Sequence, residues 1–257
     1  WYTMKICTLC PRMCAVDRKS GERGICGQTT EIKVARAALH FWEEPCISGE
    51  MGSGAVFFSG CALHCVFCQN ENIANGTAGK VISTERLGEI FLELQEKGAN
   101  NINLVTPGQF VPQIIKAVEL ARNQNLKIPI VYNTSSYENV DTIRSLEGIV
   151  DIYLPDFKYF DTALSAKYSH APDYPQVATA AIHEMLRQTG KPVFEGDMMR
   201  RGVIVRHLVL PGHTKESMAV VSHLLQEYGN DIYISIMNQY TPVRKFVEFK
   251  ELNRKVT

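Results

Sequence analysis

The stretch GCALHCVFCQN, residues 60–70, decides the fold class. It brings together Cys61, Cys65 and Cys68, with three and two residues between them. The apolar run at 55–58 comes just before it and is typical of a buried strand. Thiolates at this density favour a soft metal site that holds zinc or an iron–sulfur cluster. Because a structural zinc site normally closes with four protein ligands, three thiols indicate a site with one position open for chemistry.

The composition is that of an ordinary globular protein without a strong electrostatic field. Of 257 residues, 45% are hydrophobic and 21% are charged, and Lys plus Arg equals Asp plus Glu at 27 each. This balance predicts neither a nucleic-acid partner nor a membrane partner. We find no signal peptide and no apolar run of about 18 residues, so we expect a cytoplasmic protein. In that compartment, eight clustered cysteines favour metal ligation over disulfides.

From residue 54 onward, short apolar runs alternate with amphipathic stretches, a pattern that predicts an α/β fold with a parallel sheet. The predicted strands are 54–59, 101–105, 129–133, 150–154, 202–210 and 231–236. The predicted helices lie near 84–97, 111–124, 138–146, 174–188 and 214–228. Six strands suit a partial (β/α)6 barrel, and in parallel barrels the chemistry lies at the carboxyl ends of the strands.

The spacing and the flanks of residues 60–70 resemble the cluster loop of radical S-adenosylmethionine (SAM) enzymes, in the pyruvate formate-lyase-activating-enzyme-like branch. The resemblance implies a radical SAM partial barrel and a [4Fe–4S] cluster on Cys61, Cys65 and Cys68, with SAM on the fourth iron. It further implies that a one-electron reductant, such as flavodoxin or ferredoxin, drives cleavage of SAM to methionine and a 5′-deoxyadenosyl radical. The protein then orients the cofactor and excludes competing reactions.

For the substrate, the branch implies a protein glycine that loses a hydrogen atom when a glycyl radical enzyme is activated. Radical SAM modification of another peptide or of a small molecule is an alternative. This alternative stays open because residues 106–109 are Thr-Pro-Gly-Gln, whereas simple activases carry a Gly-Gly-Glu stretch at this position. The alternative from another class is a non-catalytic iron–sulfur electron carrier.

The first part of the chain carries a second set of thiols, which predicts a small knuckle around one further metal. Four ligands would close this site, as structural zinc or as an auxiliary [4Fe–4S] cluster, and a disulfide pair is the alternative. The set is Cys7, Cys10, Cys14 and Cys26.

We therefore expect two parts: a cysteine-rich metal-binding segment with its linker at 1–45, and the barrel at 46–257. Residues 31–39 alternate loosely, as a strand in the linker would. Cys46 is interpreted either as a small buried apolar residue or as a thiol near the mouth of the cluster site.

Polar side chains follow three of the predicted strands. Thr106 ends the second strand, as a SAM contact or as part of a plain Pro-Gly turn. Asn133 and Ser135 follow the third and offer hydrogen bonds to a nucleoside, although such loops are often only turns. Asp156 and Lys158 share one face after the fourth strand and resemble an Asp-Leu-Lys element that binds SAM, with a surface ion pair as the alternative.

The last two strands supply one more residue each. Arg206 lies within an apolar strand, where burial is costly unless the guanidinium meets an anion, so we expect the SAM carboxylate or Asp156 as its partner. Its surroundings resemble the Ile-Arg-x-x-x-x-Pro-Gly element of the same family. Met237 suits packing beside the adenine ring of SAM, and a plain core methionine is the alternative. The resemblance covers residues 43–242.

Overall fold

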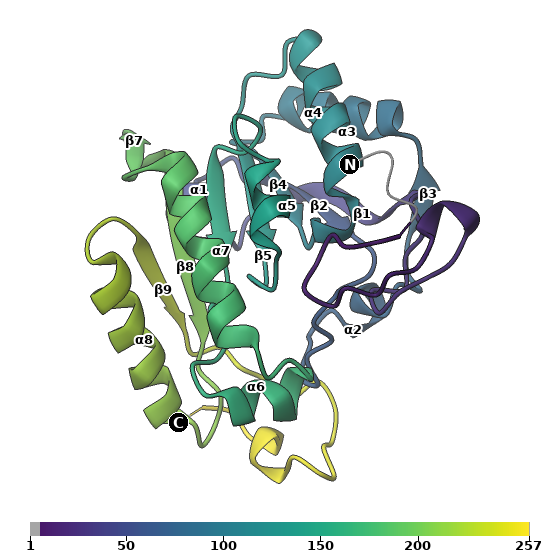
Figure 1. Cartoon of the computed structure of the whole chain (residues 1–257). Coiled ribbons are helices and arrows are strands. Elements are labelled where there is room, and N and C mark those ends of the chain that lie inside the picture. Colours follow the sequence, from purple (N-terminus) through teal and green to yellow (C-terminus); the bar gives the residue numbers. More distant parts are fainter. Residues whose placement is uncertain (1–5, 257) are drawn as a thin grey trace.

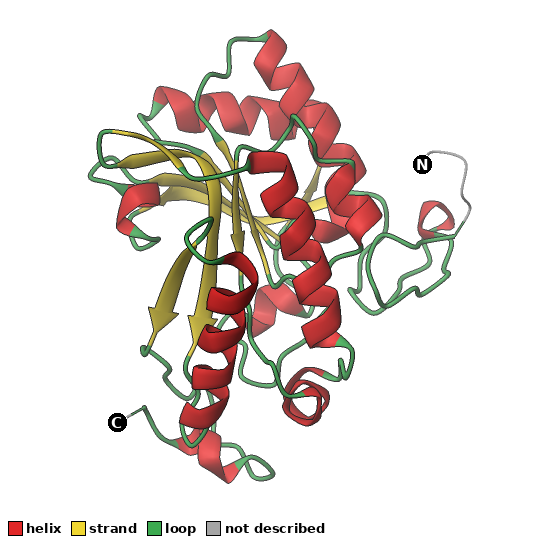
Figure 2. Cartoon of the chain, turned by 60° about the vertical axis from the view of Figure 1, so that its left-hand side comes forward, coloured by secondary structure: helices red, strands yellow, loops and turns green. Residues whose placement is uncertain are grey.

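The computed structural model describes residues 6–256, which form a curved sheet of nine strands with helices around its outside (Figures 1 and 2). The strand order is β3-β1-β2-β4-β5-β6-β8, and both β7 and β9 pair with β8. From β2 through β4, β5, β6 and β8 to β9, every pairing is parallel. The predicted α/β fold with a six-stranded partial barrel is confirmed.

The six parallel strands lie within a few residues of their predicted ranges. Only β8 begins clearly earlier, because its first residues form an antiparallel hairpin with β7 before the strand joins β6. The bounds are β2 (Ser53–Phe58), β4 (Ile102–Val105), β5 (Ile130–Thr134), β6 (Ile152–Pro155), β8 (Met198–Leu208) and β9 (Tyr233–Met237).

Three further strands extend the sheet in the antiparallel sense: β1 (Ile32–His40), β3 (Lys80–Ile82) and β7 (Val193–Glu195). Strand β1 pairs with both β2 and β3, so the expected linker strand is part of the main sheet. The division at residue 45 stays a prediction, and β1 joins its two parts through backbone hydrogen bonds.

The helices begin where local sequence signals place them. In α3 (Thr84–Glu96), the Ser83 hydroxyl accepts the backbone N–H of Arg86, and Leu87, Phe91 and Leu94 recur on one buried face. No helix in the described part of the chain is long and apolar enough to cross a membrane. The other helices are α1 (Pro45–Ser48), α2 (Glu71–Ala74), α4 (Val111–Asn123), α5 (Val140–Arg144), α6 (Thr162–Ser169), α7 (Tyr174–Thr189) and α8 (Thr214–Tyr228).

Two apolar layers lie on opposite faces of the sheet. The larger one fills the space between the sheet and the outer helices. The smaller one lies inside the barrel, where Ile47 of α1 packs on Val131 and Ile204, and Cys46 packs against the same group. Helix α1 is fastened there by the side chain of Asn101, whose Nδ2 donates to the Ile47 carbonyl at 2.7 Å. Cys46 thus packs as a partly buried apolar residue, the first of its two interpretations, and it does not line the cavity at the cluster loop.

Candidate functional site

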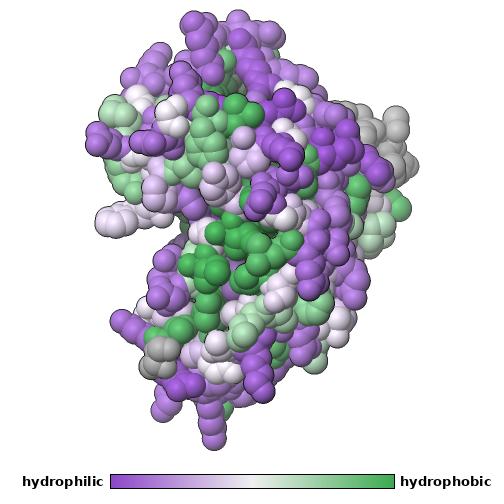
Figure 3. All heavy atoms as spheres, turned by 90° about the vertical axis from the view of Figure 1, so that its left-hand side faces the viewer, coloured by the Kyte–Doolittle hydropathy of each residue, from purple (hydrophilic) through white to green (hydrophobic). Residues whose placement is uncertain are grey.

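A cavity of about 290 Å³ lies at the carboxyl ends of the parallel strands, beside the loop at 60–70, which we call the cluster loop. Its lining brings together all the predicted cluster ligands and SAM-binding residues of the barrel. The face seen in Figure 3, on the side where β9 lies in Figure 1, is indented at mid-height, with apolar side chains gathered beside the indentation. The predicted residues in the lining are Cys61, Cys65, Cys68, Thr106, Asn133, Ser135, Asp156, Lys158, Arg206 and Met237.

Phe67 anchors the cluster loop to the barrel. Its buried ring meets the rings of Tyr159, Tyr168 and Tyr240 in edge-to-face contacts, with centroids 6.2 to 6.5 Å apart. The backbone N–H of Val66 donates to the Tyr168 carbonyl at 2.8 Å. The loop is therefore held in place by a buried aromatic side chain between two of its cysteines.

The three thiols of the cluster loop suit an iron–sulfur cluster. The Ser169 hydroxyl donates to Sγ of Cys65 at 3.1 Å. Burial raises the pKa of Cys65 and raises that of Cys68 to about 11, while the charge of Lys158 lowers both. Buried thiols of this kind become thiolates when a metal replaces the proton. Three thiols at one cavity wall, close to an ammonium group, therefore fit a [4Fe–4S] cluster with one iron left for another ligand.

A single metal ion would need a different geometry. Among residues 6–256, no group of three or more His, Cys, Asp and Glu side chains is arranged to hold one ion. A [4Fe–4S] cluster does not require such convergence, because each thiolate binds a different iron atom.

Opposite the thiols, five polar side chains form a connected network. Asp156 accepts from Nζ of Lys158 at 2.7 Å and from Nε of Arg206 at 2.9 Å. The other two nitrogens of Arg206 donate to Oε2 of Glu43 at 3.0 Å and to Oδ1 of Asn133 at 2.7 Å. Arg206 thus meets Asp156, one of its two expected partners, and its three nitrogens are all bonded.

The network holds two positive and two negative groups in a buried place. Burial alone would raise the pKa of Asp156, but the charges of Arg206 and Lys158 outweigh it and lower that pKa. Burial also lowers the pKa of Lys158, and the Asp156 carboxylate more than reverses this, so the ammonium stays charged. For Glu43, burial raises the pKa despite the opposing charge of Arg206. Glu43 was not among the site residues predicted from the sequence. The feature that could have indicated it is the pair of carboxylates at 43–44, which follows two aromatic residues.

Thr106 adopts a backbone conformation that β-branched residues rarely take. Its φ is +55°, in the left-handed region, and its N–H donates to the carbonyl of Asn133 at 2.9 Å. The Gln109 side chain binds the Thr106 carbonyl at 2.9 Å and also reaches the carbonyls of Ser59 and Gly60. Gln109, which was not predicted as a site residue, therefore ties the end of β4 to the start of the cluster loop.

Three more strand ends, those of β5, β6 and β9, are held by hydrogen bonds to other segments. The Tyr174 hydroxyl of α7 lies 2.9 Å from the Ser135 carbonyl and 2.8 Å from the Asp156 carbonyl, and it accepts the N–H of Lys158 at 2.9 Å. On β9, the Met237 carbonyl accepts the backbone N–H of Val209, the residue after β8, at 2.9 Å. Tyr174 was missed, since its role depends on packing across four elements.

The N-terminal cysteines lie next to the cluster loop. Cys7, Cys10 and Cys26 line a small pocket together with Cys61, and Cys14 accepts the N–H of Ile25 at 3.3 Å. All of these thiols are free, so the disulfide alternative is not realised. Burial raises the pKa of Cys10 to about 12 and also raises that of Cys26. A metal on the four thiols stays a prediction.

Arg12 connects this N-terminal segment to the cluster loop. Its guanidinium donates to the carbonyls of Ala62 at 2.9 Å, Leu63 at 3.5 Å and Ser169 at 2.9 Å. It also stacks over the Tyr137 ring, 5.0 Å from its centroid. At Gly60, with φ of +88°, a Cβ would collide with a carbonyl of the N-terminal segment, so glycine permits this close approach.

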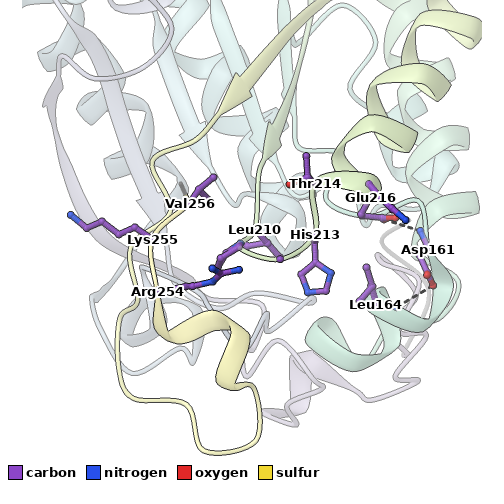
Figure 4. Close-up of a pocket in the computed structure, with 12 residues that line it drawn as sticks. Asp161, Leu164, Leu210, His213, Thr214, Glu216, Arg254, Lys255 and Val256 are labelled. Carbon is purple, nitrogen blue, oxygen red and sulfur yellow. Dashed lines mark hydrogen bonds between the residues drawn. The ribbon is translucent and has the colours of Figure 1, made fainter.

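A second cavity, of about 490 Å³, lies outside the barrel between α6, the start of α8 and the C-terminal tail (Figure 4). The carboxylate of Glu216 in this cavity is already hydrogen-bonded, because it accepts the backbone N–H groups of Phe160 and Asp161. The ring of His213 lies 2.9 Å from the Tyr168 hydroxyl. None of the predicted site residues lines this cavity.

Comparisons with known proteins agree with this geometry. The family model described as the radical SAM superfamily matches residues 55–225. The chain is 27% identical over 260 residues to an uncharacterized protein of Methanocaldococcus jannaschii (MJ0674), covering 98% of this chain and 71% of that protein.

Two solved structures share the fold. The structure of native anSMEcpe with bound AdoMet and a peptide matches 74% of this chain and 52% of its own, with 12% identity and a TM-score of 0.52. Methylornithine synthase (PylB) matches 72% of this chain and 53% of its own, with 16% identity and a TM-score of 0.50. The chain thus spans about half the length of these two structures.

The matched range contains the three thiols of the cluster loop and continues through the ends of the strands that carry Asp156 and Arg206. It covers more than half of the chain. The family is associated with a [4Fe–4S] cluster and SAM, which the donor set at the cavity fits. By its sequence and by the arrangement of its cavity, the chain belongs to the radical SAM superfamily.

Proposed function

We propose that this chain is an enzyme of the pyruvate formate-lyase-activating-enzyme-like branch, acting on a glycine of a protein or peptide. The observation that carries the proposal is the cavity itself, in which three thiols face a buried network of Asp156, Lys158 and Arg206. A non-catalytic electron carrier would have no use for such a network. When bound, the reduced cluster supplies the electron that splits SAM into methionine and the hydrogen-abstracting 5′-deoxyadenosyl radical.

The chain's own residues bind and orient the cofactors. Cys61, Cys65 and Cys68 would hold three irons as thiolates. Lys158 and Asp156 carry the opposite charges that the carboxylate and ammonium groups of SAM require. Of the remaining predicted contacts, Asn133 and Ser135 would hydrogen-bond the nucleoside and Met237 would pack beside its base. Thr106 would contact the SAM ammonium group, and Arg206 would face the SAM carboxylate.

A second part of the proposal concerns the N-terminal thiols. We propose that they hold one further metal, as zinc or as an auxiliary [4Fe–4S] cluster, because all four are free and three of them line a pocket with Cys61. Arg12 supports this position by fastening the segment to the cluster loop. The four ligands would be Cys7, Cys10, Cys14 and Cys26.

A peptide or protein substrate is supported by the shape of the molecule. The sheet is open, with β9 at one edge and the antiparallel strands β1 and β3 at the other, so the barrel does not close around the cavity. An open side admits an extended chain more readily than a sealed pocket would. The electron would come from an external one-electron reductant, such as flavodoxin or ferredoxin.

The test is anaerobic reconstitution with iron, sulfide, SAM and reductant, followed by an assay for 5′-deoxyadenosine. The variant with Cys61, Cys65 and Cys68 all replaced by Ala should lose the cluster absorbance and the product. Cys46→Ala is the matched control, because that thiol packs on the smaller apolar layer, does not line the cavity and should be dispensable. Deoxyadenosine formed at the wild-type rate by the triple variant would reject the assignment.

The substrate class needs its own experiment. A candidate partner protein with deuterated glycine should transfer deuterium to 5′-deoxyadenosine, and an electron paramagnetic resonance signal should appear on the partner. Label that arrives only from a small metabolite would reject the glycyl-radical part of the proposal.

A further inference from the structure

The N-terminal segment carries a buried guanidinium group that no carboxylate balances. Arg18 is only 5% exposed. Its Nε, Nη1 and Nη2 donate to the backbone carbonyls of Gln28 at 3.1 Å, Gln109 at 2.8 Å and Thr29, all of which are neutral. A guanidinium group is always charged, and burial of a charge is costly unless an opposite charge lies nearby. Within residues 6–256, no acidic side chain forms an ion pair with Arg18, so its charge is unbalanced.

Two other arginines show how this protein treats the same group elsewhere. Arg206 is nearly as enclosed, at 14% exposure, but it meets the carboxylates of Asp156 and Glu43. Arg12 donates only to carbonyls, as Arg18 does, but its side chain is partly exposed to water. Arg18 differs from both, because it is buried and has neither a carboxylate nor solvent to offset its charge.

Arg18 faces the N-terminal thiols. It lines the same pocket as Cys7, Cys10 and Cys26. Its Nη1 lies 3.9 Å from Sγ of Cys7, and its charge lowers the pKa of Cys26, which burial raises. Glu138 lines this pocket too, but it forms no ion pair with Arg18 and accepts two hydroxyl groups instead. Of the groups in the pocket that can become negative, the thiol of Cys7 is therefore the one in contact with Arg18.

The four thiols form one set whose surroundings favour the thiolate form. Cys14 does not line the pocket, but its charge raises the pKa values of both Cys10 and Cys26, so it lies close to them. Backbone N–H groups donate to all three of these sulfurs. Hydrogen bonds of this kind stabilise a thiolate relative to a thiol. The segment thus offers both dipoles and a full positive charge to sulfur atoms that would be negative with a metal bound.

A metal on these thiols would supply the missing negative charge. Zinc brings two positive charges to four thiolates, and the oxidised core of a [4Fe–4S] cluster brings two as well, so either centre is anionic. We propose that Arg18 is the counter-charge of a metal–thiolate centre on Cys7, Cys10, Cys14 and Cys26, and that its charge keeps the metal bound. This inference rests on the second part of the proposed function, and it names the residue that allows an anionic centre to be buried there.

A purely structural role for Arg18 predicts a different pattern of variants. Its guanidinium group joins three carbonyls and lies over the Phe110 ring, 5.8 Å from the centroid. That role depends on the planar fork of donors, which neither Lys nor Gln reproduces. The counter-charge role depends on the charge, which Lys keeps and Gln loses. Arg18→Lys and Arg18→Gln therefore separate the two roles.

The experiment measures metal release. The anaerobically reconstituted chain is mixed with EDTA, and zinc and iron are followed over time. Parallel samples lack the three thiols of the cluster loop, so their metal belongs to the N-terminal thiols. Arg18→Gln should release this metal about 10–100 times faster than the wild type, and Arg18→Lys should stay close to the wild type. Arg23→Gln is the matched control, because Arg23 is an exposed arginine of the same segment that also donates to a carbonyl.

Release at the wild-type rate from Arg18→Gln would overturn the proposal. Equally fast release from Arg18→Gln and Arg18→Lys would assign Arg18 a structural role and would overturn it too. Arg18→Met is a second neutral variant that keeps the apolar part of the side chain, and it should behave as Arg18→Gln does.

Thermal unfolding gives a second measurement on the same proteins. With metal bound, Arg18→Gln should unfold at a lower temperature than the wild type. Without metal, it should unfold at the same temperature or higher, because an unbalanced buried charge has been removed. An equal decrease in melting temperature with and without metal would contradict the counter-charge role.

The outcomes also separate this inference from the proposed function. If the samples without the cluster-loop thiols hold neither zinc nor iron, the second metal of the proposed function fails, and the inference fails with it. If they hold metal that Arg18→Gln releases at the wild-type rate, only the inference fails. Cleavage of SAM is not used in any of these measurements, so they do not depend on the radical chemistry.

Discussion

Removal of the Glu43 carboxylate should destabilise the protein by about 2 kcal/mol. Oε2 of Glu43 lies 3.0 Å from Nη1 of Arg206, and the side chains are only 9% and 14% exposed. At this distance the attraction is roughly 5 kcal/mol for an effective dielectric constant of about 20. Burial of Glu43 offsets much of this, as its raised pKa indicates. The net contribution to stability of the charged hydrogen bond between Glu43 and Arg206 is therefore about 1.5–3 kcal/mol.

The perturbation is Glu43→Ala, which leaves Arg206 with Asp156 and Asn133 as partners. A loss of about 2 kcal/mol corresponds to a decrease of about 4–8 °C in melting temperature for a chain of this size. The assay is thermal unfolding followed by circular dichroism under anaerobic conditions, with wild type and variant reconstituted in the same way.

The control is an ion pair on the surface of α3. Arg86 and Glu93 are 44% and 46% exposed, so Glu93→Ala should change the stability by less than about 1 kcal/mol. If Glu43→Ala lowers the melting temperature no more than Glu93→Ala does, the buried network does not stabilise the barrel as reasoned here.

Three further outcomes are expected. Lys158→Ala should weaken SAM binding by about 1.5–3 kcal/mol in equilibrium dialysis, and unchanged affinity in separate variants of Lys158, Asp156 and Arg206 would contradict their role. Metal analysis should find about eight irons per chain for an auxiliary cluster, or about four irons and one zinc otherwise; about four irons and no zinc would exclude the second site. Glu251, bonded to Lys167 at 2.6 Å, has its pKa lowered to about 2, against burial, from an ordinary 4.5. Its stabilisation is therefore present above pH 4.5 and lost as the pH falls through 2, so Glu251→Gln should cost about 1 kcal/mol at pH 7 and nothing near pH 2, measured by urea unfolding. An equal loss at both pH values would refute this assignment.

The sequence alone determined the alternation of strands and helices and the position of the cluster loop. Both are local properties: apolar periodicity selects helix or strand, and the spacing of Cys61, Cys65 and Cys68 is covalent. The strand-end residues could be predicted for a related reason. Once the strands are parallel, their carboxyl ends must meet at one edge, so residues such as Asn133 and Asp156 come together without knowledge of side-chain packing.

Only the tertiary structure decided which of these groups bond to one another. Glu43 and Arg206 are 163 positions apart, and their pairing depends on how α1 packs inside the barrel. The hydrogen bond from Arg12 to the Ala62 carbonyl likewise joins two segments whose contact no local sequence pattern predicts. Asn101 and Asn103 look equivalent in the sequence, yet within residues 6–256 the side chain of Asn101 is hydrogen-bonded and that of Asn103 is not. A hydrogen bond requires both partners within about 3 Å, and that condition is set by packing across the whole chain.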